Sequence, residues 1–198
     1  MKKLITSLTS IGLASTASAA LTLVTNGDFS SGGADWGFAG VGAAPTYEAT
    51  GGNADGYAKI DQTAGGWGGV LINNNDTAVS LTSLNLIQGQ SYEFSIDLIN
   101  LGAGSPVAGM KIESWTAGAA TDNSGDITFA TTASWANYTF NYTVQAGADA
   151  IKFVPLLVAQ PTGSSVGFDN VGVNVVPEPS SFSLLGLGLA GLLARRRR

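Results

Sequence analysis

Residues 91–100 read SYEFSIDLIN, and this stretch decides the fold class of the chain. Apolar side chains occupy every second position, at Tyr92, Phe94, Ile96 and Leu98. Residues 136–144, ANYTFNYTV, repeat the pattern. Because successive side chains of a strand point to opposite faces, each stretch predicts a β-strand with one buried side and one polar side.

Short apolar stretches continue along the chain. They predict further strands at 21–25, 57–62, 69–73, 79–87, 108–115, 151–158 and 166–175. Turn-forming stretches such as GGNADG at 51–56 and GAGSP at 102–106 separate them, and no segment of the body has a sustained helical period. About eight or nine antiparallel strands in one domain predict an all-β, jelly-roll β-sandwich.

The last predicted strand contains an irregularity. Its apolar residues stand at even positions up to Phe168 and at odd positions from Val171 onward, so the alternation flips at Asp169 and Asn170. The flip indicates either a β-bulge or a twist near the start of the strand.

The two ends of the chain differ from the body. Residues 1–19 carry Lys2 and Lys3, a mildly apolar stretch and a small-residue site, which is typical of a removed secretory signal peptide. The apolar run 182–194 near the other end has thirteen residues. A helix needs about twenty to span a bilayer, so this run predicts a short apolar helix rather than a permanent anchor.

The body, residues 20–176, is strongly acidic. It contains three lysines and thirteen acidic residues, a formal charge of −10. This charge excludes nucleic acid and anionic membrane surfaces as partners. The chain has no Cys and no His, which excludes disulfides, His-dependent catalysis and the usual zinc ligands. The remaining oxygen ligands favour calcium.

Four motifs of the body resemble a known group of proteins. They are LVTNGDFSSGGADWGF at 23–38, LNLIQGQSYEFSIDL at 84–98, TASWANYTFNYTV at 132–144 and VGFDNVGV at 166–173. Together they look like carbohydrate-binding modules of the family four, nine and twenty-two group. The resemblance covers residues 21–176 and implies a jelly roll of galactose-binding-like topology.

The tail, residues 177–198, resembles the PEP-CTERM sorting signal of Gram-negative bacteria that make exopolysaccharide. The sorting residues are Pro177, Glu178, Pro179, Arg195, Arg196, Arg197 and Arg198. The resemblance implies cleavage near the motif by an exosortase, after a transient stop in the inner membrane. The protein would then reach the cell surface or the extracellular matrix. A weak permanent tail anchor is the alternative.

Sugar-binding modules stack a pyranose ring on an aromatic side chain. Trp67 lies in a glycine-flanked loop, and Trp115 shares the polar face of its strand, so both are candidates. Trp36 and Trp135 are predicted to be structural. The candidate hydrogen-bonding side chains are Lys111, Glu113, Glu93 and Asn137. The alternatives are a ring that closes the end of the sandwich for Trp67 and plain solvated strand faces for the polar residues.

The resemblance also implies a structural calcium ion. In the resembling modules the ion is held near the first strand, by a glycine-containing turn and by an Asp of the last strand. The matching positions here are Asp28, Gly52 in the turn 51–53 and Asp169.

Three classes of function follow. The first is a non-catalytic, sugar-binding protein of the envelope or matrix, which predicts an exposed Trp67 or Trp115. The second is a structural matrix protein without glycan affinity, which predicts those rings buried. The third is a glycoside hydrolase or lyase, for which Glu93 and Glu113 are the pair to test. The first class is favoured, and the chain is predicted not to be an enzyme.

Overall fold

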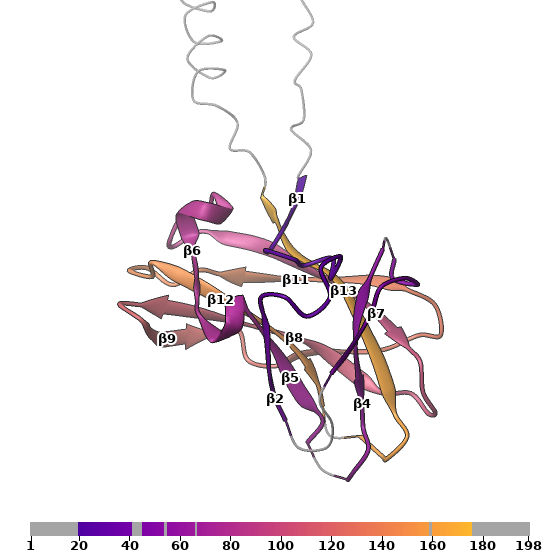
Figure 1. The fold of residues 1–198 in the computed structure, drawn as a ribbon. Coiled ribbons are helices and arrows are strands. Elements are labelled where there is room, and N and C mark those ends of the chain that lie inside the picture. Colours follow the sequence, from indigo (N-terminus) through magenta and orange to yellow (C-terminus); the bar gives the residue numbers. More distant parts are fainter. Residues whose placement is uncertain (1–19, 41–44, 54, 66, 159, 176–198) are drawn as a thin grey trace, which may run out of the picture. The chain divides into compact units, whose positions relative to one another are not determined.

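Two antiparallel sheets form the part of the chain that the structure describes (Figure 1). The structure, a computed structural model, describes residues 20–40, 45–53, 55–65, 67–158 and 160–175. The sheets contain six and seven strands, and together they form the predicted all-β jelly-roll sandwich.

Sheet A is built around the last strand of the sandwich. Its order is β3 (Thr46–Glu48), β4 (Tyr57–Asp61), β13 (Ser165–Val175), β7 (Ser91–Asn100) and β11 (Ala136–Thr143). β1 (Ala20–Leu23) pairs with the second half of β13. All of these pairs are antiparallel.

Sheet B is built around β12. Its order is β2 (Trp36–Ala39), β5 (Gly69–Asn73), β12 (Ala150–Leu157), β8 (Val107–Thr116) and β10 (Ile127–Ala130). β9 (Ala119–Asn123) pairs with β8, and the two-residue β6 (Val79–Ser80) pairs with the start of β12. β6 and the flanking 3-10 helices η1 (Asn74–Asp76) and η2 (Leu81–Leu84) belong to one connecting segment between β5 and β7.

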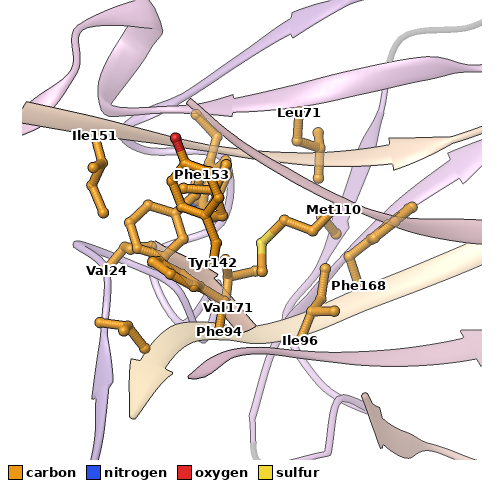
Figure 2. Packing of buried hydrophobic residues seen from close by; sticks show 14 of the residues in the cluster. Val24, Leu71, Phe94, Ile96, Met110, Tyr142, Ile151, Phe153, Phe168 and Val171 are labelled. Atoms are coloured by element: carbon orange, nitrogen blue, oxygen red, sulfur yellow. The ribbon is translucent and has the colours of Figure 1, made fainter. Parts of the chain in front are cut away.

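The core lies between the two sheets (Figure 2). Phe94 of sheet A and Phe153 of sheet B pack with their ring centroids 5.6 Å apart. Ile96 and Met110 add aliphatic contacts from the two sides. Burying each such side chain stabilises the fold by about 1.5–3 kcal/mol, so a continuous core can hold this domain together without a disulfide.

The irregularity predicted in the last strand is a β-bulge. In the pairing of β13 with β7, Asp169 lies opposite Asp97 and Gly172 lies opposite Ser95, so β13 contains one extra residue. Asn170 takes a left-handed backbone conformation with a φ of 47°, which asparagine tolerates better than most residues. The extra residue keeps Phe168 and Val171 both in the core.

One predicted strand is wrong. Residues 79–87 form a strand only at β6 and then turn into η2. Leu81 and Leu84 are three residues apart and both buried, and this spacing fits a 3-10 helix, in which positions i and i+3 share a face. The first apolar residues of this stretch fit both the two-residue period of a strand and the three-residue period of a 3-10 helix, which explains the error.

The other predicted strands are observed within two residues of their expected ends. The structure adds four short strands that the sequence did not reveal, β2, β3, β9 and β10. All residues of β9 are exposed, so it has no apolar alternation to detect. The predicted C-terminal apolar helix and the signal peptide lie outside the described residues. Among the helices of the described part, none is long and apolar enough to cross a membrane.

Candidate functional site

Lys111, Glu113 and Trp115 lie on the face of β8 that points away from the core. Ile112 and its neighbours at alternate positions belong to the core cluster, whereas these three side chains do not. Lys111 Nζ lies 2.6 Å from Glu113 Oε1. The sequence prediction that these residues share one face is therefore confirmed.

β12 contributes to the same face. Its side chains Lys152, Val154 and Leu156 are buried but do not belong to the core cluster. In the register of the sheet, Val154 lies opposite Lys111, and Leu156 lies opposite Val70 of β5. We call this surface the outer face of sheet B, and its middle is apolar.

Trp115 is held in place from two directions. Its indole Nε1–H donates a hydrogen bond to Glu113 Oε2 at 3.2 Å. Lys152 Nζ lies 3.9 Å from the centroid of the Trp115 ring, a cation–π contact. Lys152 is only 4% exposed, and its ammonium group also lies 2.6 Å from Asp76 Oδ1. Trp115 is consequently half-buried rather than fully exposed.

A cavity of about 400 Å³ adjoins this ring at the end of sheet B. It is lined by Asp76, Thr77, Ala78, Trp115, Gly118, Asp149 and Ala150. We call it the Trp115 pocket. The segment before β6, the turn after β8 and the start of β12 supply its walls, so residues far apart in the sequence meet here.

Trp67 lies at the opposite end of sheet B. It is 43% exposed and belongs to the loop that leads into β5, where Gly69 pairs with Leu157. Ala150, at the other end of β12, pairs with Trp115. The eight residues of β12 span roughly 23 Å, so the two rings do not form one aromatic pair.

Glu93 and Asn137 are not part of the same site. Both belong to sheet A, where Glu93 Oε1 accepts a hydrogen bond from the Asn174 amide at 2.6 Å. Glu113 belongs to sheet B, and the core separates the two sheets. The idea that Glu93 and Glu113 form a catalytic pair is therefore wrong, because they lie on opposite outer faces.

A buried polar cluster surrounds Asp169 on the outer side of sheet A. Asp169 and its cross-strand neighbour Asp97 are 0% and 3% exposed. The backbone N–H of Asn53 donates to Asp169 Oδ2 at 2.7 Å, and its side-chain amide donates to Asp97 Oδ2 at 2.6 Å. The amides of Asn137 and Asn170 donate to Asp97 as well, at 2.7 and 2.8 Å.

The cluster brings together two of the three residues predicted to hold calcium. Gly52 faces Asp169 so closely that an added Cβ would lie 2.7 Å from Asp169 Oδ2. Asp28 instead accepts hydrogen bonds from the backbone and hydroxyl of Ser30 within its own turn. The described residues hold no group of three or more His, Cys, Asp or Glu arranged around a metal position.

The donor chemistry of the cluster nevertheless fits an oxygen-coordinated cation. Two adjacent buried carboxylates repel each other, and a divalent ion would offset that repulsion. An asparagine side chain carries both an oxygen and an NH₂ group, so a half-turn of the amide would direct the oxygen of Asn53 or Asn170 at an ion.

Trp36 is buried, as expected for a structural residue, while the structural role of Trp135 stays a prediction. Trp36 is buried beside Phe29, and its Nε1–H donates to the Asn26 carbonyl at 2.8 Å. Trp135 is half-buried and donates to the Gly51 carbonyl at 2.9 Å.

Sequence reasoning missed Lys152, Asp76 and Asp149 as members of the site. Lys152 had a detectable signal, because it is the lone charge in the apolar strand AIKFVPLL. Asp76 and Asp149 lie in connecting segments, and nothing in their sequence surroundings relates them to Trp115.

The tail matches a family of sorting signals. Residues 175–198 match the PEP-CTERM protein-sorting motif. Except for Val175, these residues lie outside the part that the structure describes. No curated protein matches the sequence.

Solved structures share the fold of the body. The C-terminal family 22 carbohydrate-binding module of Clostridium thermocellum Xyn10B is similar with a TM-score of 0.54 and 14% identity, over 82% of this chain and 96% of the module. The enzymatically active domain of tailspike protein 4 of bacteriophage CBA120 is similar with a TM-score of 0.57 and 12% identity, over 76% of this chain.

An arabinose-bound GH51 α-L-arabinofuranosidase is similar with a TM-score of 0.58 and 14% identity, over 81% of this chain. This chain spans only 21% of the tailspike chain and 27% of the arabinofuranosidase. These neighbours therefore include both a binding module and parts of catalytic proteins, and at such identities the likeness concerns the fold alone.

Proposed function

We propose that this chain is an exported protein of the cell envelope or extracellular matrix whose sandwich binds polysaccharide without cleaving it. The observation that carries the proposal is the Trp115 pocket, which combines an aromatic wall with carboxylate acceptors on a fold shared with a family 22 carbohydrate-binding module.

The chemistry of the outer face of sheet B suits a sugar chain. The Trp115 ring offers a flat apolar surface, and Asp76 and Asp149 of the same pocket offer acceptors for hydroxyl groups. Val154 and Leu156 in the middle of this face are only 4% and 3% exposed, so they add no surface for a ligand, whereas Trp67 is 43% exposed at the far end of β12. A ligand that contacts both Trp115 and Trp67 would have to span roughly 23 Å.

The placement of Glu93 and Glu113 excludes the one catalytic pair that the sequence suggested. Glycosidases need two carboxyl groups about 5–10 Å apart across the scissile bond. Glu93 and Glu113 lie on opposite sheets, and Glu113 is engaged by Lys111 and Trp115.

The sorting motif supports export and processing. A PEP-CTERM motif at residues 175–198 marks the chain for an exosortase-type membrane enzyme. The apolar run 182–194 and the arginines after it would hold the chain transiently in the inner membrane, because arginines stay on the cytoplasmic side. Cleavage near Pro177–Pro179 would then release the body to the surface or the matrix.

A structural calcium ion at the Asp169 cluster is part of the proposal. Asp97 and Asp169 would supply carboxylate oxygens, with an amide oxygen from Asn53. The ion would stabilise the junction of the turn 51–53 with the β13 bulge and take no part in sugar binding. Asp28 is no longer required for it.

Affinity electrophoresis tests the binding proposal. The full-length chain, kept in solution by a detergent without a sugar head group, is run through gels that contain xylan, β-glucan, mannan or bacterial exopolysaccharide, with calcium present. At least one polysaccharide should retard the protein. Trp115→Ala should weaken that binding by about tenfold, or 1.4 kcal/mol, whereas Ile87→Ala should not.

Ile87 is a suitable control because it is an exposed apolar residue that does not line the Trp115 pocket. Unretarded migration in every gel would contradict the binding proposal. It would favour a structural matrix protein without glycan affinity.

A further inference from the structure

The cations of the described body are all engaged by carboxylates. Lys59 lies 3.1 Å from Asp61, and Lys111 and Lys152 each lie 2.6 Å from a carboxylate oxygen. These are the only basic residues of the acidic body, residues 20–176. The body therefore offers no unpaired basic side chain to an anionic ligand, such as a uronate or sulfated sugar.

The Trp115 pocket likewise has no basic side chain in its lining. Lys152, the one basic residue beside it, is covered by the Trp115 ring and does not line the cavity. The carboxylates of Asp76 and Asp149 do line it. The Asp76 side chain is 70% exposed, with Oδ1 paired to Lys152 Nζ at 2.6 Å, and the Asp149 carboxylate accepts one hydrogen bond, from the Ala117 N–H at 3.0 Å.

An aromatic face combined with carboxylates is the chemistry that recognises a sugar unit with an ammonium group. A carboxylate accepts a charge-assisted hydrogen bond from an ammonium group that is roughly twice as strong as a neutral one, and the aromatic ring supplies a flat apolar surface for the sugar ring. An ammonium group brings three donors, whereas a hydroxyl group brings one. A cavity of about 400 Å³ lies within the usual range for small-molecule sites, so a single sugar unit fits.

We infer that the Trp115 pocket binds a sugar unit that carries a protonated amine, so that the ligand is a cationic, amino-sugar-containing polysaccharide. This inference rests on the proposed function and narrows it. The amine lies against the carboxylate of Asp149 and beside Asp76, whose Oδ1 also pairs with Lys152, and the sugar ring lies against the part of Trp115 that lines the pocket. The overall negative charge of the body raises the local concentration of such a ligand.

Three oligosaccharides that differ only at one carbon test this assignment. The β-1,4-linked tetramers of glucose, N-acetylglucosamine and glucosamine carry a hydroxyl, an acetamide and an amine at the same position. Their affinities for the full-length chain are measured by calorimetry, in a buffer acidic enough to keep the amines protonated. A short aliphatic diamine is the fourth ligand, because it carries ammonium groups without a sugar.

The glucosamine tetramer should bind at least about tenfold more tightly than the other two tetramers. Its affinity should fall as salt is added, since salt screens partly exposed charges. Asp149→Asn keeps an acceptor for the Ala117 N–H but removes the charge, and it should reduce the preference for the amine by about tenfold.

Asp126→Asn is the matched control. It removes the same charge from an exposed turn next to the Ile127–Met110 pair, roughly 17 Å along β8 from Trp115, and should leave the preference unchanged. Thermal melting of both variants checks that they fold.

Each outcome decides a different point. Equal or tighter binding of the glucose or N-acetylglucosamine tetramer overturns the amino-sugar assignment and leaves the proposed polysaccharide binding intact. Equal binding of the diamine overturns the sugar part of the assignment. If none of the four ligands binds, the inference fails, and the polysaccharide gels decide separately whether the proposed function fails with it.

Discussion

Ser114 and Tyr142 form a buried hydrogen bond that joins the two sheets. The Ser114 hydroxyl of β8 lies 2.8 Å from the Tyr142 hydroxyl of β11. Ser114 also accepts the Gln145 N–H at 3.1 Å, and the Tyr142 ring packs against Phe94. This buried polar contact therefore ties β11, an edge strand, to the opposite sheet.

Tyr142→Phe should lower the free energy of unfolding by about 1–2 kcal/mol at neutral pH, because Ser114 loses a buried partner while the ring contacts remain. Urea unfolding measures the change. An unchanged midpoint would show that this hydrogen bond does not stabilise the fold.

The same variant should respond differently to alkali. Burial raises the pKa of Tyr142 above its ordinary value of 10.0, although the hydrogen bond from Ser114 opposes this effect. Above pH 10 the unfolded chain therefore binds fewer protons than the folded one, and the stability of the native protein falls as the pH rises. In Tyr142→Phe the part of this loss of stability that comes from ionisation of Tyr142 should be absent, and urea unfolding at several pH values above 10 measures it.

At the scale of elements, the β13 bulge and the turn 51–53 meet at the Asp169 cluster. The bulge places Asp169 beside Asp97, and the tight approach of Gly52 leaves no room for a larger residue. Two carboxylates are thereby buried at one point of the outer side of sheet A, and the proposed calcium ion would balance their charge.

Calcium at one hundred times its dissociation constant should raise the melting temperature by roughly 5–10 °C, and a chelator should reverse the change. Asp169→Asn should abolish this response, because it removes one of the two buried carboxylates. Asp28→Asn should keep it, since Asp28 bonds to Ser30 instead. A melting temperature that changes neither with calcium nor with chelator would rule out the ion.

At the scale of the whole molecule, the chain combines an acidic body with a sorting motif at residues 175–198. The charge of the body and the charge of the tail have opposite signs. The proposed export of the body, with the arginines of the tail held on the cytoplasmic side, would require this separation.

The mass of the mature protein from a producing cell tests the processing. The mature chain should begin near residue 20 and end near Pro177–Pro179. Glu178→Ala should retain the tail through Arg198, because it alters the sorting motif, whereas Ser181→Ala should be processed normally. A native protein of full length would contradict both cleavages.

Much of the fold could be read from the sequence because it depends on local alternation. The period-two pattern of residues 91–100 marks β7, and the flip at Asp169 and Asn170 marks the bulge. The alternation says which side chains share a face of one strand. It fails where a stretch is short or fully exposed, as in β9, or where two periods overlap, as around Leu81.

The sequence by itself determined the β-sandwich, the acidic body, the sorting signal and the grouping of Lys111, Glu113 and Trp115 on one face. Only the tertiary structure decided that Glu93 and Glu113 lie on opposite sheets and that Lys152, Asp76 and Asp149 surround Trp115. The reason is physical. Strand pairing joins segments far apart in the chain, and no local pattern records which strands become neighbours.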